Sequence, residues 1–236
     1  MDIEEYSKRS PQFYSDKIPA LLRHYLNVKN YSVILDAGCG DGSLLYALFI
    51  NGYLKDRKVL AIDLSQNRIN LLNSYFSKKC NNIIASVDNV EDLMTVTNES
   101  VDLLISNQVI EHVNDKKFLN TIYRVMRKGG IVYLTTIQKK KHAWYFYRND
   151  EKWVLDPTHL KEYENDTELL SILNEEDFAI LENRKDLIRF SLIDFIIKNI
   201  GIENREFLVN SKLAYFRRLK IPIFGYYNWT LVFSKK

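Results

Sequence analysis

The chain has little of what marks a secreted, metal-stapled or membrane-spanning protein. Its 236 residues include only two cysteines, Cys39 and Cys80, which are too few for a disulfide framework and lack the spacing of a zinc site. The 33 basic and 30 acidic residues leave a net charge of +3, which argues against nucleic-acid binding along the whole chain. The most apolar stretch, Leu192 to Ile202, contains Asp194 and Lys198 and is too short to span a bilayer.

The start of the chain and its composition further narrow the class of protein to which the chain can belong. The opening segment, MDIEEYSKRSPQFY, is polar and acidic, unlike a secretory signal. With 46% hydrophobic and 27% charged residues, the composition is that of a globular protein, which excludes disorder and collagen-like repeats. We find no internal repeat, low-complexity tract or linker, and the length suits one α/β domain. We therefore expect a cytoplasmic protein with a single domain over residues 1–236.

Short apolar segments alternate with helix-like segments in the first 137 residues. The expected strands are Val33–Asp36, Val59–Asp63, Ile83–Val87, Val101–Ser106 and Ile131–Thr136. The expected helices are a segment around Ile18–Tyr25, then Leu44–Asn51, Gln66–Ser77 and Lys116–Arg127, the last followed by a turn at Gly129-Gly130. Strands that are apolar throughout and alternate with helices predict a parallel sheet covered on both faces. Such sheets bind ligands at the carboxyl ends of their strands.

The alternation loosens after residue 137. Residues 138–163 are aromatic and charged without a clear period. The later expected elements are a helix at Thr167–Leu173 with N-cap Asp166, a strand at Phe178–Glu182, a helix at Leu187–Ile200, and a strand at Asn228–Ser234 after the breakers Pro222 and Gly225. We interpret residues 138–163 and 187–222 as insertions that shape the acceptor site beside a core at residues 30–137.

A glycine-rich loop, Asp36-Ala37-Gly38-Cys39-Gly40-Asp41-Gly42, joins the first strand to a helix. Glycines let the backbone turn sharply and approach a ligand, and the helix N-terminus offers N–H donors. A dinucleotide-binding loop would need its third glycine at position 43, whereas here it stands at position 42. Asp36, just before the loop, suits a ligand with a positively charged amino group better than a pyrophosphate.

This loop resembles motif I of the class I S-adenosylmethionine-dependent methyltransferases, and more specifically the type-11 group that includes the ubiquinone-biosynthesis O-methyltransferases. Further matches follow in the family's order: VLAIDLS at 59–65, SVDNVEDL at 86–93, VDLLISNQVIEHVND at 101–115 and RVMRKGGIVYLTTI at 124–137. The resemblance implies a doubly wound, Rossmann-like, mostly parallel seven-stranded sheet with an antiparallel last strand and helices on both faces. It implies S-adenosylmethionine as the cofactor.

The resemblance also implies a set of cofactor-binding residues. Asp63 would bind both ribose hydroxyls, and Asp88 or Asn89 would accept from the adenine amine. The full set is Tyr14, Asp36, Gly38, Cys39, Gly40, Gly42, Asp63, Leu64, Asp88, Asn89, Val90, Asn107 and Gln108. Cys39 is expected to be a small packed residue of the loop and not a nucleophile.

Two of the four histidines fall on the expected acceptor side, His112 and His159. In ubiquinone-biosynthesis O-methyltransferases the segment around His112 reads E-V-I-E-H-V, and its acids and histidine can hold a divalent metal. Here Gln108 replaces the first acid, so we expect no metal. Catalysis and hydrogen bonding within the loop both stay open for His112. For His159, before a helix that related enzymes place over the substrate, we expect a catalytic role.

The aromatic segment after the fifth strand is expected to cover the acceptor. Its candidate substrate contacts are Trp144, Tyr145, Tyr147 and Trp153. The alternative is that these rings pack on the sheet edge.

These features predict methyl transfer to an oxygen of a small-molecule, quinone, sugar or lipid-linked acceptor by in-line displacement. Methylation of RNA or protein is a second interpretation, because Arg184–Lys236 holds 11 Lys/Arg against 4 Asp/Glu. No RNA-binding module is visible. A third is a cofactor-binding scaffold without catalysis. The apolar stretch Leu187–Ile200 suits contact with a membrane surface, a dimer contact or a buried helix, and these alternatives stay open.

Overall fold

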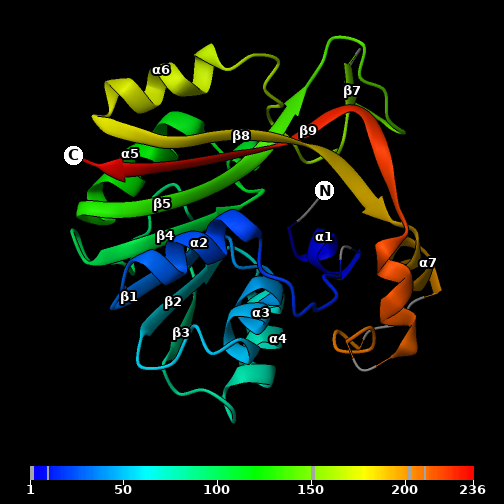
Figure 1. Cartoon of the computed structure of the whole chain (residues 1–236), viewed down its shortest axis with the longest axis horizontal. Helices are drawn as coiled ribbons and strands as arrows, with labels where there is room; N and C mark the ends of the chain where they lie inside the picture. The colour runs from blue at the N-terminus through cyan, green and yellow to red at the C-terminus, as the bar shows by residue number, and fades with distance from the viewer. Residues whose placement is uncertain (1–2, 10, 150–151, 201–203, 210) are drawn as a thin grey trace. The chain divides into compact units, whose positions relative to one another are not determined.

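The computed structural model describes residues 3–9, 11–149, 152–200, 204–209 and 211–236. Its main strands are β1 (Val33–Ala37), β2 (Lys58–Asp63), β3 (Ile83–Val87), β4 (Val101–Asn107), β5 (Met126–Lys139), β8 (Phe178–Ser191) and β9 (Lys220–Lys235). They form one seven-stranded sheet in the order β3-β2-β1-β4-β5-β9-β8 (Figure 1). The last strand, β9, is antiparallel to β5, so the predicted fold class is confirmed. The chain divides into unit 1 (Met1–Asn89 and Phe190–Ile221) and unit 2 (Val90–Arg189 and Pro222–Lys236).

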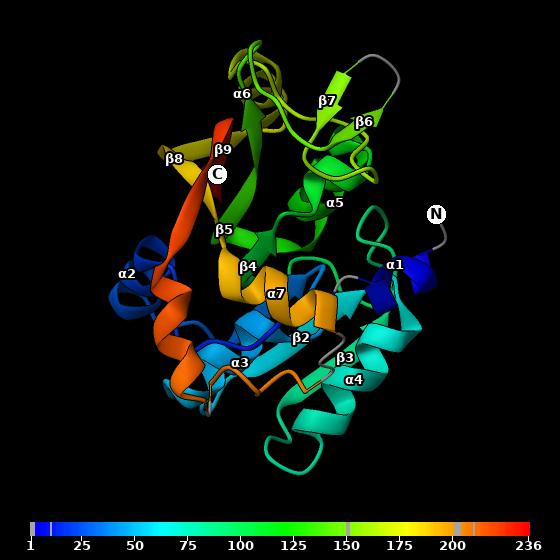
Figure 2. The same ribbon diagram turned by 90° about the vertical axis from the view of Figure 1, so that its right-hand side faces the viewer.

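Unit 1 contains the parallel strands β1, β2 and β3. Its helices are α1 (Ile3–Arg9), α2 (Ala20–Val28), α3 (Ser43–Ile50), α4 (Gln66–Phe76), α7 (Leu192–Ile200) and the 3-10 helix η2 (Lys212–Arg218). The strands bury Ile34, Leu35 and Val59 completely, as expected of a sheet covered on both faces. The side chain of Ser65 caps α4 by accepting a hydrogen bond from the Arg68 N–H. Figure 2 shows α1 beside the start of α4.

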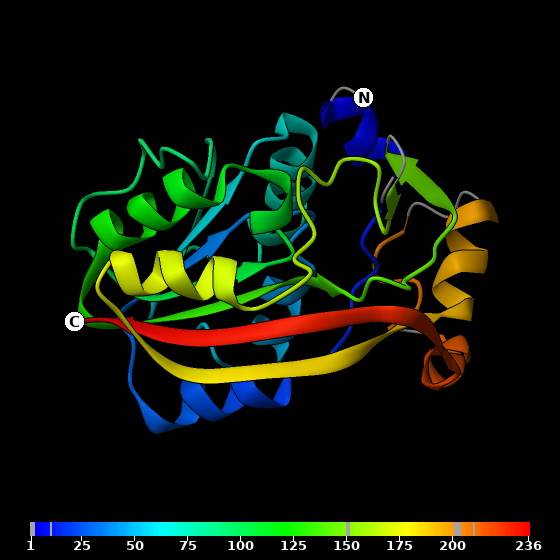
Figure 3. The same ribbon diagram turned by 90° about the horizontal axis from the view of Figure 1, so that it is seen from above.

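Unit 2 contains β4, which is parallel to β5, and the antiparallel pair of β5 and β9. Its other elements are α5 (Asp115–Val125), α6 (Thr167–Glu175), the 3-10 helix η1 (Ile110–His112) and a hairpin of β6 (Tyr147–Asn149) and β7 (Lys152–Val154). The amphipathic α5 buries Phe118, Leu119 and Ile122. Figure 3 shows α5 and α6 on the same face of the β9 and β8 strands.

The turn predicted at Gly129-Gly130 is wrong. Helix α5 passes directly into β5, and both glycines lie inside that strand. Between Val101 and Leu103 the partner residues on β5 jump from Met126 to Ile131, so the register shifts at the segment that holds the two glycines. Gly129 has a φ of 70°, which glycine adopts without strain. The two glycines therefore bend a strand instead of ending a helix.

The helix predicted at Leu187–Ile200 begins later than expected. Residues 187–191 are the end of β8, and α7 begins at Leu192. From Leu187 to Phe190 the side chains alternate between exposed and half-buried, which is the period of a strand and not of a helix. Within the described residues, no helix is both long enough and apolar enough to cross a membrane.

Pro222 and Gly225 lie inside β9 and do not precede it as breakers. The part of β9 that pairs with β5 begins at Tyr226, so the missing N–H of Pro222 removes no hydrogen bond from that ladder. Gly225 has a φ of 79°, and a Cβ there would lie 2.7 Å from the Ala143 Cα. A glycine at this position lets the strand bend past Ala143 at close approach.

Gly225→Ala is expected to lower the free energy of unfolding by about 2–4 kcal/mol, because it adds both backbone strain and a backbone clash. Gly52→Ala is the matched control, since Gly52 has a φ of 78° but no atom within 4 Å of the point that an added Cβ would occupy. The control should lose only about 1–2 kcal/mol, the strain alone. Urea denaturation of both variants measures the difference. Equal losses would contradict the close approach to Ala143.

Candidate functional site

The glycine loop of unit 1 is fixed to the neighbouring strand β2. Gly38, Gly40 and Gly42 have φ values of 81°, 56° and 81°, in the left-handed region that favours glycine. The backbone N–H groups of Gly38 and Cys39 both donate to the Ile62 carbonyl, at 2.7 and 2.8 Å. These backbone hydrogen bonds therefore hold the loop against β2, at the carboxyl end of β1.

Asp63 connects the loops that follow β1 and β2. Its carboxylate accepts hydrogen bonds from the Gly40 N–H and the Ser65 N–H, each at 2.9 Å. Burial raises the pKa of Asp63, although these two donors act in the opposite direction. The carboxylate has further lone pairs, so it can accept from a bound diol as well. The half-buried Asp88 and Asn89 follow β3. The Asp88 N–H donates to the Asp63 carbonyl at 3.2 Å, which holds this segment next to the end of β2.

Asp36 is a buried carboxylate with an unsatisfied oxygen. It is 2% exposed, and its Oδ2 has no hydrogen-bond partner among the described residues. Burial, together with the charge of Asp63, raises its pKa to about 7. A cationic ligand group would both satisfy Oδ2 and stabilise the ionised carboxylate. The neighbouring Cys39 is also buried, which raises the pKa of its thiol and keeps it protonated, so it is unsuited to nucleophilic chemistry.

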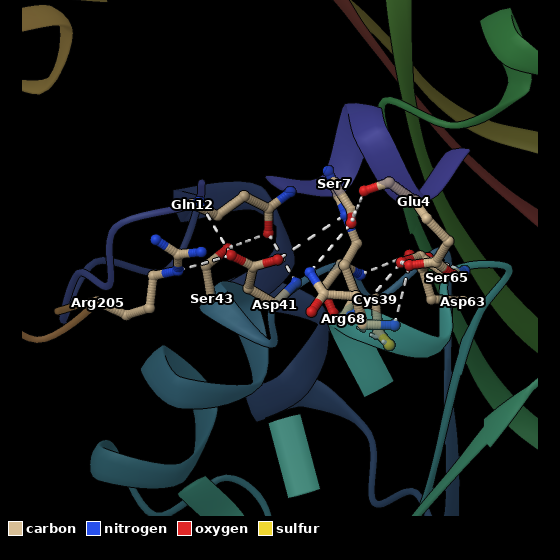
Figure 4. A network of polar contacts seen from close by, with 12 residues as sticks. Glu4, Ser7, Gln12, Cys39, Asp41, Ser43, Asp63, Ser65, Arg68 and Arg205 are labelled. Carbon is tan, nitrogen blue, oxygen red and sulfur yellow. Dashed lines mark hydrogen bonds and ion pairs between the residues drawn. The ribbon is translucent and has the colours of Figure 1, made fainter. Parts of the chain in front are cut away.

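Helix α1 is attached to the start of α4 by Glu4, a residue that sequence reasoning missed. The Glu4 carboxylate accepts from the Ser65 hydroxyl at 3.0 Å and from the N–H groups of Gln66 and Asn67 at 2.7 and 3.2 Å (Figure 4). A carboxylate at a helix N-terminus is favourable because it satisfies unpaired N–H donors. The only sequence signal was an acidic N-terminal segment, which did not indicate a partner some 60 residues away.

A second connection covers the glycine loop itself. The Gln12 Oε1 accepts from the Asp41 N–H and the Ser43 hydroxyl, both at 3.3 Å (Figure 4). A Cβ on Gly40 would lie 2.5 Å from that same oxygen, so a side chain there would displace Gln12 from this contact. The buried Asp41 also pairs with Arg205, at 2.8 Å between Oδ2 and Nε. Gln12 and Arg205 were not predicted, because their partners are far away in sequence.

Most of the predicted cofactor residues lie in unit 1. Tyr14 is buried there, donates its hydroxyl to the Asp41 carbonyl at 2.9 Å and stacks on Tyr46. Leu64 is 52% exposed. The remaining three, Val90, Asn107 and Gln108, belong to unit 2.

Asn107 and Gln108 are held by β5 and β9. The Asn107 Oδ1 accepts from the Thr135 hydroxyl at 2.6 Å. The Gln108 side-chain nitrogen donates to Thr135 Oγ1 at 3.3 Å and to Asn228 Oδ1 at 2.8 Å. Val90 is buried. Asn107 is exposed and keeps a polar side chain at the carboxyl end of β4.

The two predicted catalytic histidines come together in unit 2. Their rings lie 4.7 Å apart in an edge-to-face arrangement. The His112 Nδ1 lies 3.1 Å from the Thr158 Oγ1 and 3.3 Å from the Thr158 carbonyl oxygen. The His159 Nδ1 lies 2.7 Å from Oε1 of Glu162. In each ring one nitrogen is therefore engaged by a neighbouring polar group.

Glu162 was not predicted, yet it organises the segment around His159. Its side chain is 1% exposed and its Oε1 also accepts from the Leu155 N–H at 2.7 Å. Its Oε2 lies 3.4 Å from the Lys139 ammonium group, and Lys139 donates to the Trp153 carbonyl. The sequence signal, a Glu three residues after His159, is too common to have been informative.

Glu111 completes this cluster. It is fully buried, its Oε2 accepts from the Thr136 hydroxyl at 3.0 Å, and burial raises its pKa to about 7. The Glu111 carbonyl accepts from the N–H groups of Leu160 and Lys161. One potential ligand atom each from Glu111, His112 and His159 lie within 4.8 Å of one another. Such a cluster can bind a proton or a metal ion.

The four predicted substrate contacts form one group of rings around the β6–β7 hairpin. Trp144 lies 5.9 Å from Trp153, and Tyr145 lies 5.8 Å from Tyr147, between ring centroids. Trp144 and Tyr147 are 52% and 49% exposed. Although the rings contact one another, part of their apolar surface stays exposed to solvent.

Comparisons with known proteins agree with the resemblance seen in the sequence. A methyltransferase domain family matches residues 35–134. An uncharacterized protein of Methanocaldococcus jannaschii is 28% identical over 151 residues, which cover 64% of this chain and 60% of that protein. The ubiquinone biosynthesis O-methyltransferase of Rickettsia bellii is 28% identical over 131 residues, 54% of this chain and 50% of its own length. The matches thus span half to three fifths of these relatives.

The structural comparison extends over nearly the whole chain. The YcgJ protein of Bacillus subtilis has a similar fold, with a TM-score of 0.65 at 15% identity, over 92% of this chain and 97% of that one. The glycine loop, the acids at the ends of β1 and β2 and this seven-stranded sheet are features that the chain shares with the class I S-adenosylmethionine-dependent methyltransferases. The chain is similar to that family over residues 35–134, which a methyltransferase domain model matches.

Asp36→Asn is expected to stabilise the ligand-free protein at pH 8 by about 2–4 kcal/mol. In the unfolded chain Asp36 ionises near pH 4, whereas the folded protein keeps its proton until about pH 7. The wild type therefore loses stability as the pH rises from about 4 to 7, whereas Asp36→Asn, which cannot ionise, does not. Urea denaturation of both proteins at pH 4 and pH 8 measures this difference in the free energy of unfolding.

The same variant should bind S-adenosylmethionine at least about tenfold more weakly in calorimetry, since it lacks the charge that is expected to pair with the amino group of the cofactor. Asp56→Asn, at an exposed turn, is the control and should change neither property. A variant that keeps wild-type cofactor affinity would show that Asp36 does not bind the amino group.

Proposed function

We propose that the chain transfers a methyl group from S-adenosylmethionine to an oxygen atom of a small molecule, with quinones, sugars and lipid-linked compounds as the acceptor classes. The observation that carries the proposal is the buried Asp36, whose unsatisfied oxygen stands at the end of β1 directly before the glycine loop. The 28% identity to a ubiquinone biosynthesis O-methyltransferase supports oxygen as the acceptor atom.

The residues of unit 1 fit this cofactor. Asp36 would accept from its amino group and Asp63 from its ribose hydroxyls, while Asp88 or Asn89 would accept from its adenine amine. The left-handed glycines let the loop turn sharply at the carboxyl end of β1, where the cofactor is proposed to bind. When bound, the cofactor supplies an electrophilic methyl group on a sulfonium. The protein need only orient the acceptor, exclude water and promote loss of the acceptor's proton.

Unit 2 supplies the residues proposed for the acceptor. A hydroxyl is a weak nucleophile until its proton leaves, so polar groups that favour this loss increase the rate. His112 and His159 are the candidates for that role. The exposed rings of Trp144 and Tyr147 and the half-buried rings of Tyr145 and Trp153 are candidates for apolar contact with the acceptor body.

His159→Ala is expected to reduce turnover by about 10²–10⁴-fold, the range for loss of a proton-transfer group. Affinity for S-adenosylmethionine should change less than about threefold, because the proposed cofactor residues on β1, β2 and β3 are untouched. Calorimetry gives the affinity and transfer of labelled methyl gives the turnover. His142→Ala is the control, since His142 is exposed on the same unit. Unchanged turnover in His159→Ala would exclude the role.

The acceptor class is tested by incubating the protein and labelled cofactor with a cell extract, followed by separation into lipid, RNA, protein and small metabolites. Label in the lipid or small-molecule fraction supports the proposal. Label in RNA, lost after ribonuclease and reduced steeply by salt, would instead favour RNA methylation through the basic residues of η2. Cofactor binding without any transfer would favour a scaffold.

A further inference from the structure

We propose that a cavity at the amino ends of β2 and β3 binds a phosphate-bearing organic molecule, at a site separate from the cofactor loop. The cavity lies within unit 1 and has a volume of about 540 Å³. It is lined by the segments that follow α3 and α4 and by residues at the start of the two strands. Lys58 begins β2 and Asp63 ends it, so the cavity and this cofactor residue stand roughly 16 Å apart along one strand.

The lining of this cavity is strongly basic. One acidic residue, Asp56, stands among four cations, which leaves a net charge of +3; the cations are Lys55, Arg57, Lys58 and Lys79. Within the described residues, none of these four side chains forms a salt bridge with an acid. Clefts lined by charge of one sign concentrate ligands of the opposite sign, and lysine ammonium groups bind phosphate as point charges. The charge of the cavity therefore favours a phosphate group.

The cations are not needed to complete the helices that end beside the cavity. A helix C-terminus carries partial negative charge, and basic side chains near it often bind its last carbonyls. Here the Phe49 carbonyl of α3 accepts from the Gly52 N–H. The Phe76 carbonyl of α4 accepts from the Cys80 N–H. Among the described residues, no lysine side chain of the cavity binds a backbone carbonyl, so the ammonium groups remain available to a ligand.

Asn82 holds the cationic loop in place. Its side-chain nitrogen donates to the carbonyls of Leu54 and Arg57, each at 2.6 Å. Its side-chain oxygen accepts from the Cys80 thiol at 2.5 Å. The two carbonyls lie on either side of Lys55 in the chain, so the loop that carries this lysine is attached to the segment before β3. A loop held in this way loses little freedom when a ligand binds, which favours affinity.

One wall of the cavity is apolar. Leu54 is 1% exposed, and Phe49 is half-buried and contacts Phe76 edge-to-face. Ile84, on the edge strand β3, is 49% exposed. No atom lies within 4 Å of the point that a Cβ on Gly52 would occupy, so there is room on that side. An inorganic phosphate ion would use the cations alone, whereas a phosphate ester with an apolar body would cover these side chains as well.

The test is calorimetric titration of the whole chain with phenyl phosphate, which joins one phosphate to one apolar ring. We expect one phenyl phosphate per chain and an affinity that falls as the salt concentration rises. Inorganic phosphate should bind at least about fivefold more weakly because it lacks the ring, and phenol should not bind detectably because it lacks the charge. Equal affinity for phenyl phosphate and inorganic phosphate would overturn the assignment of an organic ligand.

A double variant, Lys55→Gln with Lys58→Gln, should bind phenyl phosphate at least about tenfold more weakly, since each lysine supplies a charge-assisted hydrogen bond. The matched control is Lys116→Gln with Lys128→Gln, two exposed lysines of unit 2 whose loss changes the net charge equally. The control should change the affinity less than about twofold, because distant exposed charges are screened. Circular dichroism confirms that each variant is folded. Absence of saturable binding by the wild type, or equal affinity in the two double variants, would overturn the proposal.

Cys80 tests whether the ligand binds in this cavity. It lines the cavity and is half-buried, whereas the other cysteine, Cys39, is buried. Bound phenyl phosphate should therefore slow the labelling of Cys80 by an uncharged thiol reagent, and an unchanged rate would overturn the assignment to this cavity. Asp36→Asn should keep the wild-type affinity for phenyl phosphate, because the cavity includes none of the proposed cofactor residues. Failure of methyl transfer would therefore count against the proposed function and not against this site.

Discussion

The arrangement of the loops after β1 and β2 in unit 1 depends on one carboxylate. Asp63 ends β2 and accepts from the backbone of the glycine loop and from the backbone that leads into α4. Two loops from different strands are thereby set at a fixed separation, which backbone propensities alone do not determine. Because the glycines of this loop allow many backbone conformations, an acceptor from the neighbouring strand helps to fix one of them. The same oxygens are those proposed to meet the ribose.

Two buried carboxylates in the candidate sites lower the stability of the folded protein. Asp36 and Glu111 are buried carboxylates, one in each unit, and each has an oxygen without a partner among the described residues. Burial disfavours their ionised forms, so both are protonated more readily than an ordinary carboxyl group. Protein interiors rarely keep such groups unless a ligand compensates them. The two positions therefore mark where the protein is incomplete on its own, and they fall in the regions proposed for cofactor and acceptor.

The sequence predicted those features that depend on residues close together in the chain. Strand β3 was predicted at its observed bounds, because a run of five residues between polar segments is too short for a typical helix. Residues 187–191 were wrong, because a short apolar run fits helix and strand equally until its neighbours are known. The contacts of Glu4, Gln12 and Arg205 could not be predicted, since each joins segments that only folding brings together. His159 was identified by its motif, but its proximity to Glu111 requires the path of the loop between β5 and α6.

The three tryptophans are distributed in a way that makes the protein its own optical reporter. Trp144 and Trp153 stand in the segment proposed to cover the acceptor, one exposed and the other half-buried, whereas Trp229 is fully buried in β9. Emission from the first two is accessible to a soluble quencher, and emission from the third is not. Loss of quenching therefore reports coverage of the aromatic hairpin, while a red shift of the protected component reports loosening of the core. Ligand engagement and unfolding can thus be followed separately in one unlabelled sample.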